Sequence, residues 1–348
     1  MSIIKVIDAH THVGFTEPGD SGAAGELYKL AEQLGYDKIN VLSLQCIRDL
    51  TQNHHCALCK IQRPEMTYAF GGLDYATGRD YLQQAKNLIK MGFDGIKMLE
   101  GKPTTRKQLG MALDDEAYDP YYSFLEETGF PVLFHVADPA TFWDREKAPG
   151  WAVEHGWLYD ESDVPYEQLY TEVENMLRKH PLIRGIFAHF YFLSDDRERA
   201  QRFLDCHPNV SIDITAGIEM YENFSKDPEF WREFFIKNAN RIVFGTDSTD
   251  TPAPPDSEEM RIDQHSEMEL RFLRTADVFP YFGTEMRGLG LPDDVLEKIL
   301  SKNFMALAGE PKPMNIPALL EEAELLRGFI EDENELKKFD GFVEQISK

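Results

Sequence analysis

Short apolar runs alternate with longer amphipathic stretches along this chain, and that alternation constrains its fold more than any other feature. Eight runs are suited to buried strands, near residues 3–8, 38–45, 66–73, 94–98, 131–136, 184–188, 209–214 and 241–246. Apolar residues recur at helical spacing between them, as at 25–34, 81–91, 166–177, 197–204 and 230–236. Eight strand–helix units in succession predict a (β/α)8 TIM barrel with long βα loops, for which about 250 residues usually suffice.

Two histidines follow the first predicted strand, in the run Asp8-Ala9-His10-Thr11-His12. Side chains alternate between the two faces of a strand, so His10 and His12 should point the same way, about 7 Å apart. Such a pair can bind one metal ion if the end of the strand bends slightly. Alone, the pair could equally be two ordinary hydrogen-bonded histidines.

Three later apolar runs also end at a side chain that can bind a metal. His135 lies at the end of the run at 131–136, His189 follows the run at 184–188, and Asp247 follows the run at 241–246. Because ligands bind at the carboxyl ends of parallel strands in α/β folds, we expect these side chains to meet there. Histidine and aspartate are suitable ligands for zinc, manganese or ferrous iron.

On these residues the chain resembles the amidohydrolase superfamily, and most of all its amidohydrolase 2 branch of metal-dependent hydrolases and non-oxidative decarboxylases. The resemblance covers residues 3–308. Its markers are the run from Asp8 to His12, His135, His189, Gly245-Thr246-Asp247, and a closing segment from Leu291 to Leu300 that is followed by Asn303-Phe304.

The resemblance implies a metal centre at the carboxyl end of the barrel. One divalent ion, with zinc expected and manganese or iron as alternatives, would be held by His10, His12, His135 and Asp247. His189 would bind a second ion or orient the substrate and the attacking water, and Asp247 would double as general base. We expect Asp8 to orient a ligand histidine.

Lys97 leaves the number of ions open. It lies in the fourth predicted strand, where some binuclear relatives carry a carboxylated lysine that bridges two ions. In the branch that the chain most resembles, this lysine is often unmodified, and we favour that form with one ion. An unmodified Lys97 would pair with a carboxylate in the barrel mouth, for which Glu100 is a candidate unless it is only a loop acid.

These residues predict a metal-dependent hydrolase of an ester, lactone or amide, with Asp247, His189 and Lys97 as catalytic residues. A bound divalent ion lowers the pKa of water from 15.7 to about 7. Asp247 could accept the proton, and His189 could stabilise the developing oxyanion. The same residues could instead serve a decarboxylase of an aromatic or unsaturated acid. A catalytically silent barrel that acts as a binding protein is the second alternative.

The stretch after the fifth strand is long for a βα loop and holds three of the four tryptophans of the chain. Its aromatic residues argue against disorder. We expect a lid in which Trp143, Arg145 and Trp151 contact the substrate. A small aromatic cluster or a subunit contact is the alternative.

Other histidines, cysteines and arginines fit structural roles better. The run His54-His55-Cys56-Ala57-Leu58-Cys59 lacks a second pair of ligands at zinc-finger spacing, so we expect buried helix residues rather than a metal or redox motif. His180 and His207 precede prolines at helix ends. Four basic residues follow the eighth strand: Arg261, His265, Arg271 and Arg274. We expect most of them to lie on a solvated helix face, although some could meet an anionic substrate group.

The composition limits the kinds of binding partner that we expect. The net charge of −25, from 36 basic and 61 acidic residues, disfavours nucleic acid and anionic membranes, which attract basic patches. We therefore expect a small-molecule substrate, and a homo-oligomer remains open. Four cysteines without framework spacing, an N-terminus that enters the first strand at once, and no long apolar run predict a cytoplasmic protein.

The barrel pattern stops at Gly309, so residues 1–309 should form the catalytic domain and 310–348 a helical extension. Three prolines between 311 and 317 mark a connector. A stripe of Leu319, Ala323, Leu326 and Ile330 predicts a helix, and a second should span 333–346. This extension could pack on the barrel or contact a partner subunit.

Overall fold

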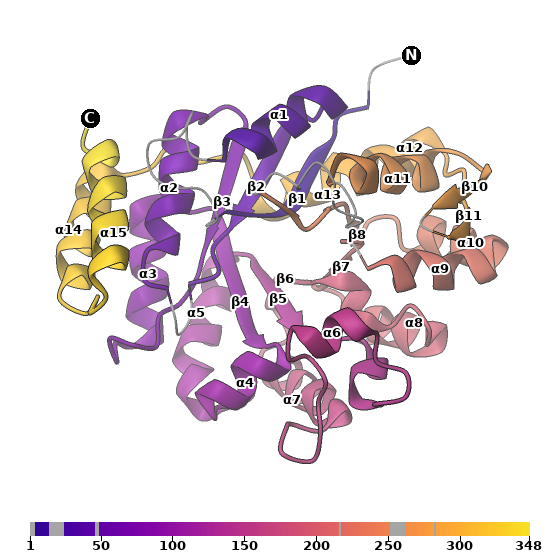
Figure 1. Ribbon diagram of the computed structural model, residues 1–348, viewed down its shortest axis with the longest axis horizontal. Helices are drawn as coiled ribbons and strands as arrows, with labels where there is room; N and C mark the ends of the chain where they lie inside the picture. Colours follow the sequence, from indigo (N-terminus) through magenta and orange to yellow (C-terminus); the bar gives the residue numbers. More distant parts are fainter. Residues whose placement is uncertain (1–3, 14–23, 46–48, 216, 251–261, 282) are drawn as a thin grey trace.

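The computed structural model describes residues 4–13, 24–45, 49–215, 217–250, 262–281 and 283–348. At its centre a curled sheet of parallel strands has the order β8-β7-β6-β5-β4-β3-β2-β1-β9, with helices around it (Figure 1). The strands are β1 (Ile7–His12), β2 (Lys38–Leu42), β3 (Thr67–Gly71), β4 (Gly95–Gly101), β5 (Val132–Val136), β6 (Gly185–Phe187), β7 (Ser211–Asp213), β8 (Ile242–Val243) and β9 (Ser248–Thr249).

The last two strands close the sheet on the first. β8 pairs with β7, whereas β9 pairs with β1 through Thr11 and Ser248. Between them, the Ala9 N–H donates to the Phe244 carbonyl at 3.0 Å, and the Asp247 N–H donates to the His10 carbonyl at 2.8 Å. β8 and β9 are therefore two halves of one eighth strand, and the predicted (β/α)8 TIM barrel is confirmed.

The helices follow the predicted alternation. The stretches predicted at 25–34 and 81–91 form α1 and α3 with the same bounds, and α3 shows why: Asp80 accepts the Gln83 N–H at 2.8 Å, and Gly92 ends the helix at φ 96°. The helices are α1 (Gly25–Leu34), α2 (Gln52–Gln62), α3 (Tyr81–Met91), α4 (Pro103–Leu109), α5 (Asp119–Thr128), α6 (Gly150–Glu154), α7 (Tyr166–Lys179), α8 (Arg197–Cys206), α9 (Ile218–Lys226), α10 (Pro228–Lys237), α11 (Ile262–Arg274), α12 (Asp293–Glu297), α13 (Asn303–Ala308), α14 (Ile316–Arg327) and α15 (Glu333–Ile346).

Shorter elements complete the fold. A hairpin of β10 (Val278–Tyr281) and β11 (Thr284–Arg287) follows α11. Single turns form at η1 (Glu116–Tyr118), η2 (Ala140–Trp143), η3 (His189–Phe192) and η4 (Lys298–Lys302). No helix in the described part of the chain is long and apolar enough to cross a bilayer.

Two predicted strands differ most from those observed. The first was expected at 3–8, but β1 spans Ile7–His12 and includes both histidines. Its pairing with β2 shifts register between Asp8 and Thr11, because the His10 N–H bonds to the Asp8 carboxylate. The eighth was expected at 241–246, but it breaks after Val243 and resumes at Ser248.

The amino-terminal part of the barrel interior is apolar. Phe304 of α13 packs edge-on against Tyr68 and stacks with Phe70, with ring centroids 5.0 and 5.8 Å apart. The same cluster includes Ile7 of β1 and Val243 of β8. Polar side chains are thereby left to the carboxyl ends of the strands.

The C-terminal extension packs on the barrel, beside α2 and α3 (Figure 1). α14 and α15 confirm both predicted helices, and Ile330, beyond the end of α14, is buried in the same apolar cluster as Leu326 and Phe339. The division into two domains stays a prediction.

The histidines and cysteines of α2 are buried helix residues, as predicted. Cys56 and Cys59 are free thiols, and the His54 Nε2 atom lies 3.0 Å from the Leu319 carbonyl oxygen of α14. Cys46 lies outside the described residues.

Candidate metal centre

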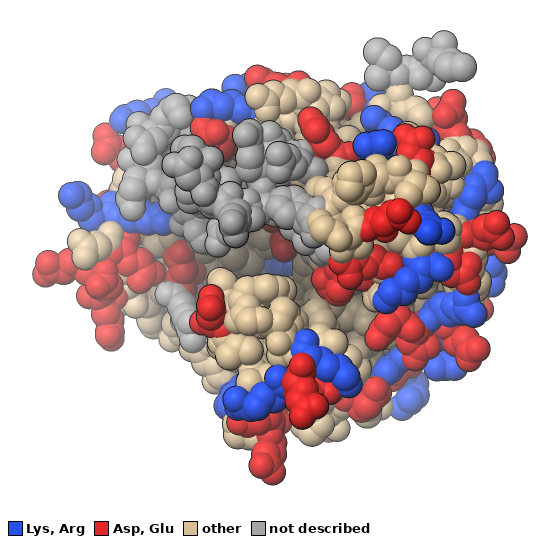
Figure 2. Space-filling view, turned by 45° about the vertical axis from the view of Figure 1, so that its right-hand side comes forward, with Lys and Arg blue, Asp and Glu red and all other residues tan. Residues whose placement is uncertain are grey.

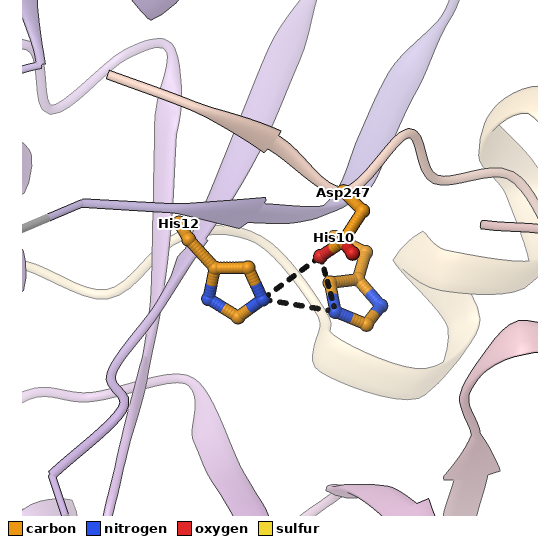
Figure 3. Close-up of side chains that lie close together, drawn as sticks. All are labelled: His10, His12 and Asp247. Atoms are coloured by element: carbon orange, nitrogen blue, oxygen red, sulfur yellow. Dashed lines mark hydrogen bonds and ion pairs between the residues drawn. The ribbon is translucent and has the colours of Figure 1, made fainter. Parts of the chain in front are cut away.

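Three of the predicted ligands meet at the carboxyl end of the barrel (Figure 3). The Nε2 atoms of His10 and His12 are 3.2 Å apart. The Asp247 Oδ1 atom lies 3.1 Å from His12 Nε2 and 3.4 Å from His10 Nε2. In the described part of the chain, this is the one group of three such side chains whose ligand atoms lie within 4.8 Å of one another.

A sharp turn in the eighth strand brings Asp247 to this position. Asp247 has φ 58°, a left-handed conformation that aspartate tolerates better than most residues. Gly245 lets the strand pass His10 closely, since a Cβ at that glycine would lie 2.7 Å from the His10 Cβ and the Thr215 Oγ1. The carboxylate therefore points back toward β1.

In His10 and His12, the hydrogen bond made by Nδ1 shows which nitrogen of the neutral imidazole carries the proton. His10 Nδ1 lies 2.9 Å from Asp213 Oδ2, and His12 Nδ1 lies 3.3 Å from the Leu42 carbonyl oxygen. Because a carboxylate and a carbonyl can only accept, each Nδ1 donates, which leaves a lone pair on each Nε2. Both lone pairs then face the Asp247 carboxylate.

Such a set of acceptors requires a cation. The buried Lys97 Nζ lies 3.3 Å from His10 Nε2. Burial lowers the pKa of Lys97 to about 8, although the carboxylates of Asp247 and Asp213 oppose that shift. Two imidazole nitrogens and one carboxylate fit zinc, manganese or ferrous iron.

His135 and His189 lie beside this group. The His189 Nε2 atom is 3.3 Å from His135 Nδ1, and the rings of His189 and His10 have centroids 5.3 Å apart. His189 Nδ1 contacts the Thr215 carbonyl oxygen at 3.2 Å, and His135 Nε2 lies 3.4 Å from Asp138 Oδ1. Metal ligation by these two histidines stays a prediction.

Two carboxylates at the site were missed by the sequence analysis. Asp213 ends β7 and contacts His10, so the rule that found Asp247, a carboxylate at the end of an apolar run, could have found it as well. Asp138 follows β5 and accepts hydrogen bonds from Lys102 at 2.9 Å and from the Tyr159 hydroxyl at 2.5 Å.

Two acids near the site differ in detail from what the sequence predicted. Asp8 accepts the backbone N–H groups of His10 and Thr246, each at 3.1 Å, and the Thr246 hydroxyl at 2.6 Å. It thus ties β1 to the eighth strand, while Asp213 orients the ring. Glu100 is neither a loop acid nor the hydrogen-bonded partner of Lys97: it is buried in β4 and accepts the Tyr75 hydroxyl at 2.7 Å. Burial raises the pKa of Glu100 to about 7.

The long segment after β5 forms an aromatic cluster. Phe142 and Tyr159 are buried in it, and Trp143 packs against them while its indole N–H donates to the Val164 carbonyl at 3.2 Å. Trp151 is 51% exposed. Through the Tyr159–Asp138 hydrogen bond this cluster connects to His135. Substrate contacts of Trp143, Arg145 and Trp151 stay a prediction.

The residues after the eighth strand divide into two kinds. Arg271 and Arg274 are exposed on α11, as expected of a solvated helix face. His265 is buried instead, with Nδ1 3.0 Å from the Tyr281 hydroxyl and Nε2 3.2 Å from Glu269, because its side of α11 faces the protein interior. Arg261 lies outside the described residues.

His180 and His207 end helices, as predicted. His180 contacts Glu126 at 3.0 Å, and His207 contacts Glu174 at 3.0 Å.

On the face shown in Figure 2, acidic and basic side chains are interspersed around a central hollow.

Comparisons with known proteins agree with the fold. A probable 2-pyrone-4,6-dicarboxylic acid hydrolase from Acinetobacter baumannii, with citric acid bound, shares 12% identity at a TM-score of 0.55, over 88% of this chain and 99% of that chain. A 4-oxalomesaconate hydratase from Rhodopseudomonas palustris shares 13% at 0.54, over 94% and 100%. A dihydroxybenzoic acid decarboxylase from Polaromonas sp. JS666, with bound manganese and the inhibitor 2-nitroresorcinol, shares 14% at 0.54, over 88% and 97%.

At these identities the likeness shows the fold alone. No curated protein matches the chain. The family is shown by a different comparison, because residues 7–307, most of the chain, match the family model described as amidohydrolase. The chain therefore belongs to the amidohydrolase family, as its strand-end residues predicted.

Proposed function

We propose that this protein is a metal-dependent hydrolase that cleaves an ester, lactone or amide bond of a small molecule. The observation that carries the proposal is the convergence of three proton acceptors, His10 Nε2, His12 Nε2 and Asp247 Oδ1, within 3.1–3.4 Å of one another. Membership of a family of enzymes agrees with it.

When bound, a divalent ion would lower the pKa of a water molecule from 15.7 to about 7 and polarise a carbonyl group. Zinc is our first choice, with manganese or iron as alternatives, and manganese is bound in the similar decarboxylase structure. His10, His12 and Asp247 would hold this ion together with His135, and His189 would bind a second ion or orient the substrate and the attacking water.

Side chains of this protein would then transfer the proton and stabilise the developing charge. The Asp247 side chain is 38% exposed, so its carboxylate can accept a proton from water and return it to the leaving group. His189 would stabilise the developing oxyanion through Nε2 once it is protonated. Lys97 would add positive charge beside His10, at 3.3 Å from its Nε2 atom.

A non-oxidative decarboxylase of an aromatic or unsaturated acid is the second candidate. Lys97 supports it, because a buried ammonium beside the proposed ion site suits a substrate carboxylate. The similarity to a dihydroxybenzoic acid decarboxylase supports it too.

Metal analysis and product analysis test the proposal together. Protein purified without added metal or chelator should hold about one ion per chain, and Lys97→Ala should keep it. A second ion that is lost in Lys97→Ala would instead indicate a carboxylated lysine. The zinc- or manganese-loaded protein is then offered a panel of lactones, aryl esters, amides and hydroxybenzoic acids.

The products separate the candidates. Acid release without CO₂ supports the hydrolase, whereas CO₂ release from a hydroxybenzoic acid supports the decarboxylase. Absence of bound metal and of any turnover would contradict both and favour a silent binding protein.

A further inference from the structure

One buried carboxylate contacts both a proposed metal ligand and the backbone of a second site histidine. Asp213, at the end of β7, has no exposed side-chain surface. Its Oδ2 atom lies 2.9 Å from His10 Nδ1, and its Oδ1 atom accepts the His189 N–H at 2.7 Å and the Thr215 N–H at 3.2 Å. Both oxygens therefore accept hydrogen bonds. The donors belong to β1, to the segment after β6 and to the segment after β7.

The bond to His10 decides which nitrogen of that ring carries the proton. The other polar side-chain atom near His10 Nδ1 is the Thr215 hydroxyl, at 3.2 Å, which can donate as well as accept. A hydroxyl that donated would move the imidazole proton to Nε2, toward Asp247. The Asp213 carboxylate can only accept, so it excludes that tautomer.

The bond to His189 holds a strained turn. His189, Phe190, Tyr191 and Phe192 have φ values of 57°, 55°, 55° and 50°. The left-handed conformation costs about 1–2 kcal/mol for each such residue, so this turn persists only if its surroundings hold it. Besides the Asp213 bond at its start, the Tyr170 hydroxyl donates to the Tyr191 carbonyl at 3.1 Å.

The turn sets where the His189 ring lies. That ring packs against His10 and His135, with centroids 5.3 and 4.8 Å away. A right-handed backbone at this position would direct the imidazole elsewhere. The position of His189 therefore depends on the carboxylate that also orients His10.

We infer that Asp213 is a positioning residue that fixes the tautomer of His10 with one oxygen and the left-handed turn that presents His189 with the other. The inference rests on the proposed metal site. Asp213 acts through the two histidines. Its loss should lower metal affinity by roughly 10–100-fold, the usual contribution of a side chain that hydrogen-bonds to a metal ligand.

Asp213→Asn is the sharpest variant, because it preserves shape and removes one acceptor. An amide has one acceptor oxygen, so it can serve His10 Nδ1 or the His189 N–H, but not both. The dissociation constants of zinc and manganese, measured by competition with a chelating dye, should rise by about 10–100-fold. An unchanged constant would overturn the inference.

Asp94→Asn is the matched control. Asp94 is equally buried but precedes β4 at the opposite end of the barrel, where it accepts Lys60 Nζ at 2.5 Å and the Ala69 N–H at 3.0 Å. It should lower the thermal unfolding temperature and leave the metal dissociation constant unchanged. Equal loss of affinity in both variants would show a general effect of destabilisation and would overturn the role of Asp213.

A measurement on the unaltered protein does not depend on folding of a variant. Nuclear magnetic resonance of protein with ¹⁵N-labelled histidine, with His10 assigned by its absence in His10→Gln, reports the tautomer directly. We expect the proton on Nδ1, with and without zinc, and a proton on Nε2 would overturn the inference. Failure of the unaltered protein to bind any ion would contradict the proposed function instead, while the metal-free tautomer still tests Asp213.

Discussion

The histidines of β1 and the histidines of α2 are similarly buried, yet they face different partners. His10 and His12 direct their Nε2 atoms toward one carboxylate, at 3.4 and 3.1 Å from Asp247 Oδ1 respectively. His54 and His55 face aromatic rings of α15 instead, with centroids 4.8 Å from Phe339 and 4.6 Å from Phe342. The first pair belongs to the site, and the second fastens the C-terminal extension.

Spacing within the element explains the difference. Residues two apart on a strand share a face, so their side chains converge even across the irregular pairing of β1. Adjacent residues on a helix are separated by about 100° and do not face each other. The same residue type therefore contributes to a candidate metal centre in one place and to a packing contact in the other.

The largest expected effect in this comparison is the loss of activity in Asp247→Asn. Removal of a general base lowers a rate by roughly 10²–10⁴-fold, and here the variant also weakens the ligand set. Hydrolysis of whichever substrate the panel identifies is the readout. Asp340→Asn, a partly exposed carboxylate on α15, is the control and should keep the full rate. Equal rates in both variants would contradict the assignment.

The converse effect is expected in α2. His54→Ala removes the ring contact with Phe339 and the bond to the Leu319 carbonyl, so the free energy of unfolding should fall by about 2–4 kcal/mol. Urea unfolding measures this loss, and elemental analysis should show unchanged metal content. Metal lost from His54→Ala would break the distinction between the two pairs.

Acid should destabilise the α2 pair in a defined window. Burial lowers the pKa of His54 and of His55 to about 4. For His55, the charge of Asp250 opposes this shift and the charge of Lys338 adds to it. In the unfolded chain these histidines titrate near pH 6.5. Between about pH 6.5 and 4 the unfolded state therefore binds protons that the folded state does not, so stability is full above this window and falls as the pH is lowered through it.

The pH dependence has its own control. The double variant His54→Gln, His55→Gln removes both groups and should show a shallower fall in unfolding free energy over that window. A slope identical to that of the unaltered protein would show that other groups control acid unfolding.

The smallest expected effect concerns the aromatic segment after β5. Trp151→Ala should raise KM by about fivefold, the equivalent of roughly 1 kcal/mol, if Trp151 contacts the substrate as predicted. Metal content should stay unchanged. Phe329→Ala, a similarly exposed aromatic residue beyond α14, should leave KM as it is. No change in either variant would favour a purely structural aromatic cluster.

Much of the site was visible in the sequence because its ligands stand where apolar runs end. That pattern identified His10, His12 and Asp247, and the alternation of runs identified the barrel around them. It placed the first strand too early, because β1 continues through both histidines by pairing Thr11 and His12 with β2 and β9, which hydrophobicity does not reveal.

The left-handed turn could not have been predicted. His189-Phe190-Tyr191-Phe192 contains no glycine or asparagine to indicate positive φ, so the turn arises from tertiary contacts such as those of Asp213 and Tyr170. The buried Glu100 was likewise hidden, since an acid near a strand end normally indicates a loop.

Metal content in two double variants tests the central claim most directly. Elemental analysis compares the unaltered protein with His10→Ala, His12→Ala and with His54→Ala, His55→Ala, all purified without added metal or chelator. We predict about one ion per chain in the unaltered protein and in the α2 variant, and almost none in the β1 variant. Metal retained after loss of His10 and His12, or lost with the α2 pair, would contradict the assignment of the site to the carboxyl end of the barrel.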